Sequence, residues 1–427
     1  MKKINLIPIA IFMCTLMASC KLNNNHDNLV VEQSNKNTET TSQEVTFSNS
    51  KLEEIVQNKI NKKGEKLSKR DLEEIVELDL KGSDITDLDD IEKLSNLRIL
   101  DLSYTKIKDL EPLKNLKKLE NLGLGENKIN SLTPIQNIIS LKKLNLENTN
   151  ISNIESLKKM VNLEELNLRN LVSIQDLTPL KNMKNLKVLN LNGCEKIGKH
   201  QANSKIIGSL KSLTTLRIQA TGIEQQMFLA KLPNLNILQA DLELNNKKLL
   251  SELEISELDI IISNDTDLSG LTCLKNLEKL YILDGTLQEI PKPIGKLKNL
   301  KVLVINDRMR ESTISDISCL KDLTKLEELQ ISGNKIKDLG PIKDLLQLIY
   351  LDLDNNNITD ISILGNLINL EHLDLSDNSI KDISILKNLI HLKELNLSGN
   401  NISDTSVLNF LTNLEYQNIE NQNITTD

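Results

Sequence analysis

Residues 370–391 read LEHLDLSDNSIKDISILKNLIH, and this 22-residue unit recurs through most of the chain. Positions 4 and 6 of the unit are leucines that alternate with polar residues, which is the period of a strand with one buried face. Positions 14, 17 and 20 are apolar at every third residue, as in a short, tight helix. The unit therefore predicts a strand, a turn, a short helix and a return to the next strand.

A single unit cannot bury its own leucines, whereas stacked copies bury them in one continuous core. We place sixteen repeat starts at Ile75, Leu97, Leu119, Leu141, Leu163, Leu186, Leu213, Leu235, Ile255, Leu277, Leu300, Leu326, Leu348, Leu370, Leu392 and, for a partial unit, Leu414. The spacing departs from 22 residues only in the middle of the array, where we expect the extra residues to form surface loops. The predicted fold is an α/β repeat solenoid with a parallel sheet inside and short helices outside.

The repeat resembles the bacterial internalin-type leucine-rich repeat, and the resemblance covers about residues 47–427. It implies a horseshoe of about 15 repeats plus a partial C-terminal unit over residues 75–427. Residues 47–74 look like the helical N-terminal cap of that family, with a helical pattern after Ser50 and a second short helix capped by Ser68. Such a cap is needed because the first repeat would otherwise expose one end of the leucine core and a bare sheet edge.

Three polar columns recur with the repeat, and we interpret all of them as parts of the fold. Asn at position 9 satisfies backbone groups of its own and the neighbouring repeat. Asp at position 13 lies in the same turn, and Pro at position 16 suits the start of a short helix. The members are Asn127, Asn334, Asn356, Asn378 and Asn400 at position 9, with Ser83, Thr105, Thr149, Cys194 and Thr221 as variants; Asp87, Asp109, Asp338, Asp360, Asp382 and Asp404; and Pro112, Pro134, Pro179 and Pro341.

The N-terminal residues predict export and lipid anchoring. Residues 1–19 have two lysines, an apolar run and small residues before Cys20, which resembles a lipoprotein signal whose cysteine is acylated. The alternative is an ordinary secreted protein with a free Cys20. Residues 20–46 are rich in Asn, Thr, Ser and Glu and predict a disordered tether. We therefore expect an extracytoplasmic protein at the cell surface or envelope, held on the membrane by its N-terminal lipid.

The composition and the motifs argue against several other functions. The net charge of −8 disfavours a nucleic acid partner, because an acidic chain repels phosphate backbones. The five cysteines have neither a disulfide framework nor a metal-binding spacing. No nucleotide-binding, hydrolase or zinc-protease motif occurs. We expect no enzyme activity, no cofactor and no metal site.

The candidate binding residues lie on the inner face of the sheet, at positions 3, 5 and 7, which point away from the core. One group is polar and aromatic: Tyr350, Asp352, His372, Asp374 and Tyr416. The other is apolar: Ile261, Tyr281, Leu283, Val302 and Val304. Tyrosines beside charges are enriched at interfaces, and adjacent exposed apolar residues mark contact surfaces. The alternative for the apolar group is that β-branched residues suit strands and are shaded by their neighbours.

We therefore expect a monomer that binds a protein ligand on its concave face, with internalin-like adhesion to a host receptor as the function that the resemblance implies. The alternative is a structural protein that scaffolds the cell's own envelope components. The fold by itself does not specify a ligand.

Overall fold

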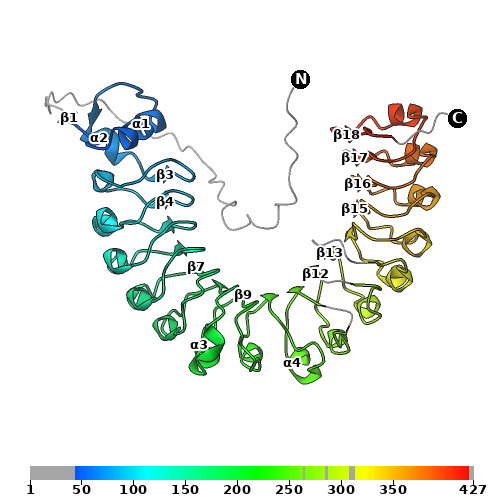
Figure 1. The fold of residues 1–427 in the computed structure, drawn as a ribbon, viewed down its shortest axis with the longest axis horizontal. Helices are drawn as coiled ribbons and strands as arrows, with labels where there is room; N and C mark the ends of the chain where they lie inside the picture. Colours follow the sequence, from blue (N-terminus) through cyan, green and yellow to red (C-terminus); the bar gives the residue numbers. More distant parts are fainter. Residues whose placement is uncertain (1–43, 263–264, 284–286, 307–312, 423–427) are drawn as a thin grey trace, which may run out of the picture. The chain divides into compact units, whose positions relative to one another are not determined.

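The computed structural model describes residues 44–422, apart from residues 263–264, 284–286 and 307–312. The described residues all belong to one compact unit (Figure 1). The predicted signal, Cys20 and most of the predicted tether lie outside the described residues. None of the helices that the structure describes has the length and apolar character needed to cross a membrane.

Sixteen parallel strands form one sheet in chain order, with each strand hydrogen-bonded to the strands of the repeats before and after it. The position-4 leucines pair in register, for example Leu78 with Leu100 and Leu351 with Leu373, so the predicted repeat frame is confirmed. The strands are β3 (Glu77–Asp79), β4 (Ile99–Asp101), β5 (Asn121–Gly123), β6 (Lys143–Asn145), β7 (Glu165–Asn167), β8 (Val188–Asn190), β9 (Thr215–Arg217), β10 (Ile237–Gln239), β11 (Glu257–Ile260), β12 (Lys279–Leu283), β13 (Val302–Asn306), β14 (Glu328–Gln330), β15 (Tyr350–Asp352), β16 (His372–Asp374), β17 (Glu394–Asn396) and β18 (Tyr416–Asn418).

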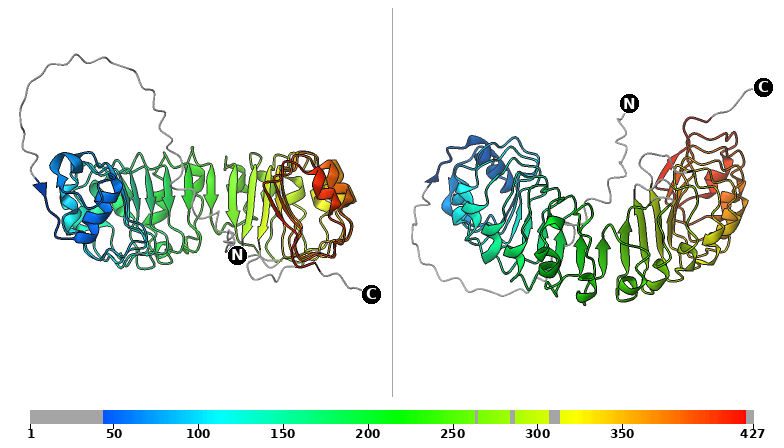
Figure 2. Two further views of the ribbon diagram at one scale, coloured as in Figure 1. Left: turned by 90° about the horizontal axis from the view of Figure 1, so that it is seen from above. Right: turned by 60° about the horizontal axis from the view of Figure 1, so that its bottom comes forward.

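Short helices on the outer side of the repeats return the chain to the sheet, and most of them are 3-10 helices (Figures 1 and 2). They are η2 (Ile91–Lys93), η3 (Glu111–Asn115), η4 (Thr133–Ile135), η5 (Glu155–Lys159), η6 (Thr178–Leu180), η7 (Ile197–Lys199), α3 (Ala202–Ile207), η8 (Leu229–Lys231), α4 (Lys247–Ser251), η9 (Leu271–Cys273), η10 (Ile294–Lys296), η11 (Ser318–Asp322), η12 (Gly340–Ile342), η13 (Ser362–Asn366), η14 (Ser384–Asn388) and η15 (Ser406–Phe410). The leucine-rich repeat horseshoe with its helices on the convex side is therefore confirmed.

The longest insertion differs from the prediction of a surface loop. It contains helix α3, and Asn203 within that helix is 1% exposed. The Asn203 amide donates to the carbonyls of Gln175 and Ile197 and accepts a hydrogen bond from the Leu177 backbone N–H. Because Gln175 and Leu177 belong to the preceding repeat, the insertion packs into the array.

The N-terminal cap contains α1 (Ser50–Lys59) and α2 (Lys69–Glu73). Strand β1 (Glu44–Val45), before α1, pairs antiparallel with β2 (Leu67–Ser68), which lies between the two helices. Asn49, one residue earlier than the sequence pattern indicates, caps α1 by accepting from the Leu52 N–H. Ser68 and Asp71 form a reciprocal capping box at α2, so the predicted cap residue Ser68 is confirmed. Leu52 and Val56 are fully buried and cover the first repeat.

The position-9 asparagines form the predicted structural ladder. The Asn378 amide donates to the carbonyls of Leu353, Leu375 and Ser376 at 3.0–3.1 Å and accepts from the Ile358 N–H at 2.9 Å. Two of these four partners belong to the preceding repeat. The side chain therefore replaces backbone hydrogen bonds that the tight turn leaves unmade.

The position-13 aspartates also serve the fold, as predicted. The Asp382 carboxylate accepts from the backbone N–H of Ser384 at 2.8 Å, directly before helix η14. That backbone hydrogen bond holds the pKa of Asp382 below its usual range, and Asp404 repeats the arrangement with Ser406. Each carboxylate therefore accepts a hydrogen bond from the first residue of a short helix and stabilises its start.

Position 8 has a left-handed backbone in most repeats, which sequence periodicity did not indicate. Gly, Asn and Asp take this conformation at most of these sites, but Tyr104, Glu126 and Ala220 take it as well, with φ of 59°, 61° and 54°. A left-handed residue is needed here because the chain reverses direction directly after each strand.

Candidate functional site

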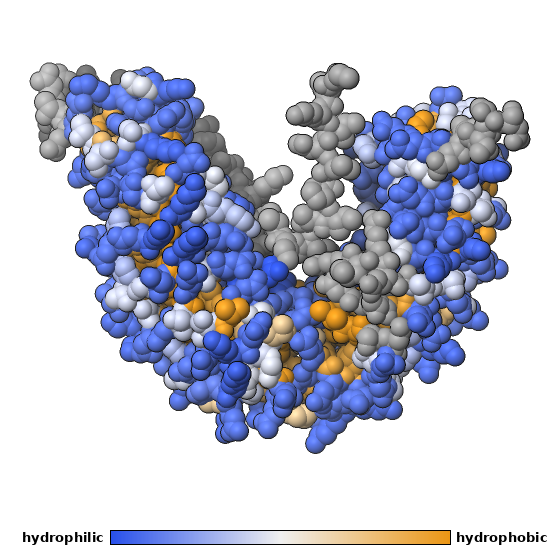
Figure 3. All heavy atoms as spheres, in the orientation of Figure 1, coloured by the Kyte–Doolittle hydropathy of each residue, from blue (hydrophilic) through white to orange (hydrophobic). Residues whose placement is uncertain are grey.

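The concave face is built from three columns of side chains, at positions 3, 5 and 7 of each repeat. Parallel strands in register place equivalent residues of neighbouring repeats side by side, about 4.8 Å apart. Hydrophilic residues cover most of the surface visible in Figure 3, and hydrophobic surface appears in bands between them. Regular stacking therefore brings together residues that lie 22 or more positions apart in sequence.

Tyr350, His372 and Glu394 occupy position 3 on the adjacent strands β15, β16 and β17. The Tyr350 and His372 rings stack with centroids 5.5 Å apart and planes at 27°. His372 Nδ1 lies 3.2 Å from Glu394 Oε2, within ion-pair distance, but this buried nitrogen makes no hydrogen bond. Tyr416, next along the same column on β18, is 51% exposed. The structure thus assembles the predicted aromatic column.

Two predicted carboxylates, Asp352 and Asp374, lie beside this column at position 5. Asp374 accepts hydrogen bonds from the Ser376 N–H and the Asn396 amide. Burial raises the pKa of Asp352 to about 7, with a further contribution from the charges of Asp374 and Asp354; the hydrogen bond from the Asp354 N–H opposes this rise. Burial also raises the pKa of Tyr350 to about 12. Keeping these carboxylates ionised while they are buried costs free energy, and a cationic partner beside them would reduce that cost.

Charge compensation differs between the two halves of the concave face. In the N-terminal half, Lys143 pairs with Glu165 at 2.6 Å, and Arg169 pairs with Glu147 at 2.9 Å. In β14–β18 and the turns that follow, positions 3, 5 and 7 contain no Lys or Arg. They contain His372 and the acidic residues Glu328, Asp352, Asp354, Asp374, Glu394 and Glu420. The C-terminal half of the face is therefore the more acidic half.

The predicted apolar group is brought together only in part, and the expectation that it is exposed was wrong for Tyr281, Val302 and Val304. Tyr281, Val302 and Val304 are only 5–8% exposed and form a small hydrophobic cluster of their own, separate from the main core, with Leu283 packed against it. Ile261 is 45% exposed and lies outside the cluster. The neighbouring strands β12 and β13 pair over five residues each, two more than most strands of the sheet. The alternative of shaded strand residues thus fits three members of the group.

Asp259 is a residue of this region that sequence reasoning missed. It pairs in register with Tyr281, is only 7% exposed, and its Oδ1 has no hydrogen-bond partner. Burial raises the pKa of Asp259 to about 7, with help from the Glu257 charge and against that of Arg217. The available signal was a position-5 carboxylate directly beside a position-5 tyrosine in the next repeat.

Unpartnered buried polar atoms concentrate on the concave face. Among the described residues, four buried side-chain atoms lack a hydrogen-bond partner: Ser83 Oγ, Gln219 Nε2, Asp259 Oδ1 and His372 Nδ1. The last three belong to concave positions 7, 5 and 3. Buried polar atoms are nearly always satisfied in native proteins, so this concentration indicates a surface that is completed by a partner or by ordered water.

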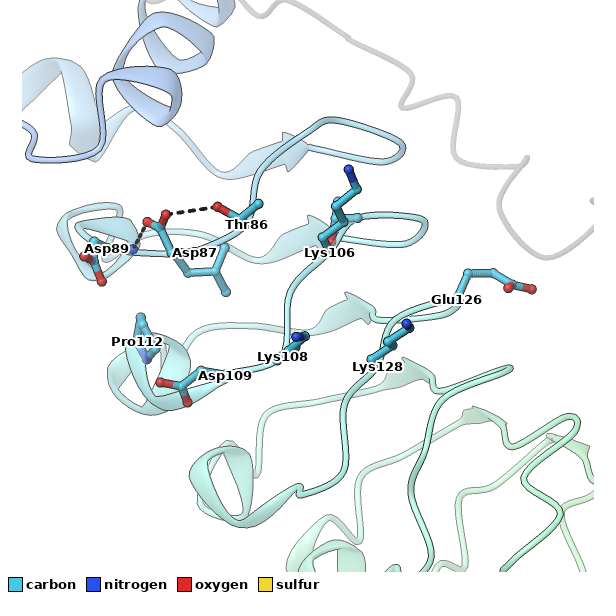
Figure 4. A pocket seen from close by; sticks show the side chains of 11 residues that line it. Thr86, Asp87, Asp89, Lys106, Lys108, Asp109, Pro112, Glu126 and Lys128 are labelled. Carbon is cyan, nitrogen blue, oxygen red and sulfur yellow. Dashed lines mark hydrogen bonds between the residues drawn. The ribbon is translucent and has the colours of Figure 1, made fainter.

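A separate hollow of about 620 Å³ lies at the edge of the N-terminal repeats, where the chain leaves the strands (Figure 4). Asp87, Asp109, Lys106 and Lys128 are among its lining residues, which carry both signs of charge. Asp87 accepts hydrogen bonds from the Asp89 N–H and the Thr86 hydroxyl, which accounts for its position in the turn. None of the predicted binding residues lines this hollow.

The described residues offer no cluster of three His, Cys, Asp or Glu arranged to hold a metal ion. Cys194, Cys273 and Cys319 are free thiols. The Cys194 thiol donates to the Leu168 carbonyl at 3.0 Å, and burial raises its pKa to about 12. This cysteine is therefore a member of the position-9 ladder, as predicted, and is not an activated nucleophile.

Comparison with known proteins identifies the repeats. The model "Leucine Rich repeats (2 copies)" matches residues 73–115, 95–137 and 346–389, and the model "Leucine Rich repeat" matches residues 322–340 and 388–411. No curated protein sequence matches the chain significantly. These matches identify the repeats within residues 73–137 and 322–411 as leucine-rich repeats, in agreement with the sheet and the short helices of the structure.

Solved structures of leucine-rich repeat proteins are similar to this chain. A leucine-rich repeat protein of Leptospira interrogans is 26% identical, with 82% of this chain and 97% of that chain covered and a TM-score of 0.54. Internalin InlF of Listeria monocytogenes is 27% identical over 88% of this chain and 96% of that chain, with a TM-score of 0.47. The receptor TLR13, solved with ssRNA13, is 24% identical over 79% and 61% of the two chains, with a TM-score of 0.52. These likenesses concern the fold and leave the ligand open.

Proposed function

We propose that this chain is a lipid-anchored, extracytoplasmic leucine-rich repeat protein that binds another protein through its concave face. The observation that carries the proposal is the concentration there of buried polar atoms that make no hydrogen bond: Gln219 Nε2, Asp259 Oδ1 and His372 Nδ1. A bound protein surface supplies the hydrogen bonds that the free face lacks. No enzymatic role is included, because none of these groups has a nucleophile, base and oxyanion donor around it in the usual arrangement.

The C-terminal half of the face is the proposed main contact. The stacked Tyr350 and His372 rings provide a rigid aromatic surface, and such residues are enriched among the energetically dominant contacts of interfaces. The surrounding carboxylates favour a partner surface with lysine or arginine. Ile261 and the cluster of Tyr281, Val302 and Val304 form the middle of the face, where only Ile261 is freely available for contact.

Anchoring at Cys20 follows from the leader and is part of the same proposal. An acylated Cys20 and the tether of residues 20–46 hold the solenoid outside the cytoplasm, where it meets a host receptor in internalin-like adhesion. Labelling with radioactive palmitate should mark the wild-type chain and leave the Cys20→Ser variant unmarked. Labelling of the Cys20→Ser variant as strongly as the wild type would exclude this anchor.

The binding proposal is tested by affinity capture with the full chain from extracts of host cell surfaces and of bacterial envelopes. A protein retained by the wild type should be lost, or weakened about tenfold or more, with the Tyr350→Ala/His372→Ala variant. The matched control is Val172→Ala, because Val172 is 50% exposed and lies in a turn away from the face. Equal capture by the wild type, the double variant and the control, all folded, would refute concave-face binding. A partner from the host extract indicates adhesion, whereas a partner from the bacterial envelope indicates scaffolding.

A further inference from the structure

One edge of the repeat array carries two separate aliphatic stripes. Position 21 lies in the turn that leads from each outer helix into the next strand, and it is aliphatic and exposed in two runs of consecutive repeats. Stripe N consists of Ile139 and Val161, which are 54% and 41% exposed. Stripe C consists of Leu346, Ile368 and Ile390, which are 49%, 54% and 53% exposed. Members of each stripe are 22 residues apart, so they stack on consecutive turns at about 4.8 Å.

The core does not require these side chains. The preceding residue of each turn, such as Ile138, Leu345 or Leu367, already fills the core at 0% exposure. In most other repeats position 21 is polar or proline: Ser95, Lys117, Lys184, Lys211, Pro233, Lys275, Lys298, Thr324 and Thr412. Adjacent exposed aliphatic residues on an otherwise polar edge indicate a contact surface.

The charges that border the two stripes have opposite sign. Lys117 and Lys184 occupy position 21 on the repeats directly before and after stripe N, and both are exposed. Exposed Glu327 and Glu415 occupy position 2 at the two ends of stripe C. The lysines are three repeats apart and the glutamates four, or roughly 14 Å and 19 Å at the strand spacing, so with the stripes centred on each other each lysine lies within about half a strand spacing of the opposite glutamate along the edge.

The carboxylates near stripe N are already neutralised within the chain. Glu120 pairs with Lys142 at 2.7 Å and with Arg98, and Glu164 pairs with Lys187 at 2.6 Å. The bordering lysines therefore give stripe N a positive rim. The glutamates at the ends of stripe C make its rim more acidic than that of stripe N, although Glu371 in its middle is paired with Lys393 and the exposed Lys325, bonded to Asn299, lies two residues before Glu327.

The two stripes occupy the same edge in opposite halves of the sheet. Stripe N precedes the fourth and fifth strands, β6 and β7, and stripe C precedes the thirteenth to fifteenth, β15, β16 and β17. A two-fold axis near the middle of the sheet, lying in the plane of contact, places stripe N of one copy on stripe C of the other. Each contact then occurs twice, which is the property of an isologous dimer.

We propose that the chain forms a two-fold dimer in which stripe N of each copy packs on stripe C of its partner, with the rim lysines opposite the rim glutamates. The contact uses an edge of the solenoid, so both concave faces stay open for the binding proposed above. This dimer differs from the monomer expected from the sequence, and the tests below separate the two.

The first test is sedimentation equilibrium of the full chain with Cys20→Ser, which removes the lipid. A species of twice the 48.1 kDa chain mass should dominate at micromolar concentration. Val161→Glu and Ile368→Glu should each weaken the dimer about 100-fold or more, because a charge is buried against aliphatic side chains. Val172→Glu, which introduces the same change at an equally exposed valine on the opposite edge, should leave the dimer intact.

The second test identifies which stripe meets which. Lys117→Glu/Lys184→Glu and Glu327→Lys/Glu415→Lys should each weaken the dimer, and the combination of all four changes in one chain should restore it about tenfold. Thermal melting establishes that every variant is folded, and Ile368→Ser replaces Ile368→Glu where the latter is not. A wild-type chain that stays monomeric up to about 100 µM overturns the proposal. A dimer indifferent to Val161→Glu, or a folded quadruple variant without recovery, overturns it as well.

Discussion

At the scale of single residues, the repeat depends on buried asparagines whose side-chain amides form hydrogen bonds with backbone C=O and N–H groups. Asn400 is 0% exposed and donates to Leu375 and Leu397, as Asn378 does one repeat earlier. Gln422 performs this role at the last position 9, with its longer side chain reaching Leu397 O and Ile419 O. Asn378, Asn400 and Gln422 share an amide that both donates and accepts.

Asn378→Ala should lower the free energy of unfolding by about 2–4 kcal/mol, because it leaves several buried backbone groups unsatisfied. Asn357→Ala is the matched control, since Asn357 is exposed in the adjacent repeat, and it should change stability by less than about 0.5 kcal/mol. Urea unfolding followed by circular dichroism measures both. Equal effects of the two changes would contradict the ladder.

Asp259 gives the stability a pH dependence opposite to that of an ion-paired carboxylate. Its pKa is about 7 in the folded chain and near 3.8 when unfolded, so the folded state holds a proton that the unfolded state releases. Stability from this group is therefore complete below pH 3.8 and is lost as the pH rises to about 7.

Asp259→Asn should remove this loss of folding stability at high pH, because the amide does not ionise. At pH 8 the variant should exceed the wild type by on the order of 2–4 kcal/mol, whereas at pH 5 the gain should be much smaller. Asp352, whose pKa is raised in the same direction, remains in both chains and cancels in the comparison. Urea midpoints at the two pH values measure the difference, and a gain that does not grow with pH would show that the carboxyl is not protonated when folded.

Much of the residue-level detail was predictable, and the part that was not has a physical reason. Asn378, Asp382 and Pro341 recur at fixed positions, and a fixed position in a repeat implies a shared structural task. The burial of Tyr281 and Val304 was not predictable, because periodicity says which side of the sheet a residue faces but not how much its neighbours cover it. Asp259 was missed for the same reason, since its environment depends on three adjacent strands.

At the scale of elements, the strands and short helices follow from the apolar pattern, while the turns between them depend on backbone conformation. Position 8 is left-handed in most repeats, and a hydrophobicity pattern has no information on φ. Helix α3 was likewise hidden within an insertion, because a six-residue helix leaves too short a pattern to distinguish from a loop.

Ala220→Gly should stabilise the chain by about 1 kcal/mol, because Ala220 has a φ of 54° and glycine adopts this conformation without steric cost. The matched control is Ala202→Gly at the exposed start of α3, which should destabilise by up to about 1 kcal/mol. Thermal melting compares the two. The same sign for both substitutions would show that the left-handed turn at Ala220 is not strained.

At the scale of the whole molecule, each repeat contacts chiefly its neighbours, so stability is a sum of local terms and the two ends behave differently. The N-terminal end is covered by α1, with Leu52 fully buried. At the C-terminal end, Gln417 replaces the position-4 leucine of β18, and Tyr416 is half exposed. In the middle, β12 and β13 pair over five residues each, and a second hydrophobic cluster lies on them.

Hydrogen exchange of the full chain should therefore be graded along the solenoid. Amides of β17 and β18 should exchange first, those of β3 and β4 later, and those of β12 and β13 last, because local opening begins where the fewest buried contacts are lost. Leu52→Ala should remove about 2–5 kcal/mol from the cap and bring the exchange of β3 and β4 forward while leaving β17 and β18 unchanged. Mass spectrometry of peptic fragments resolves these segments. Uniform exchange along the chain, or a response of β17 to Leu52→Ala, would mean that the solenoid opens as a single cooperative unit and that its stability is not a sum over neighbouring repeats.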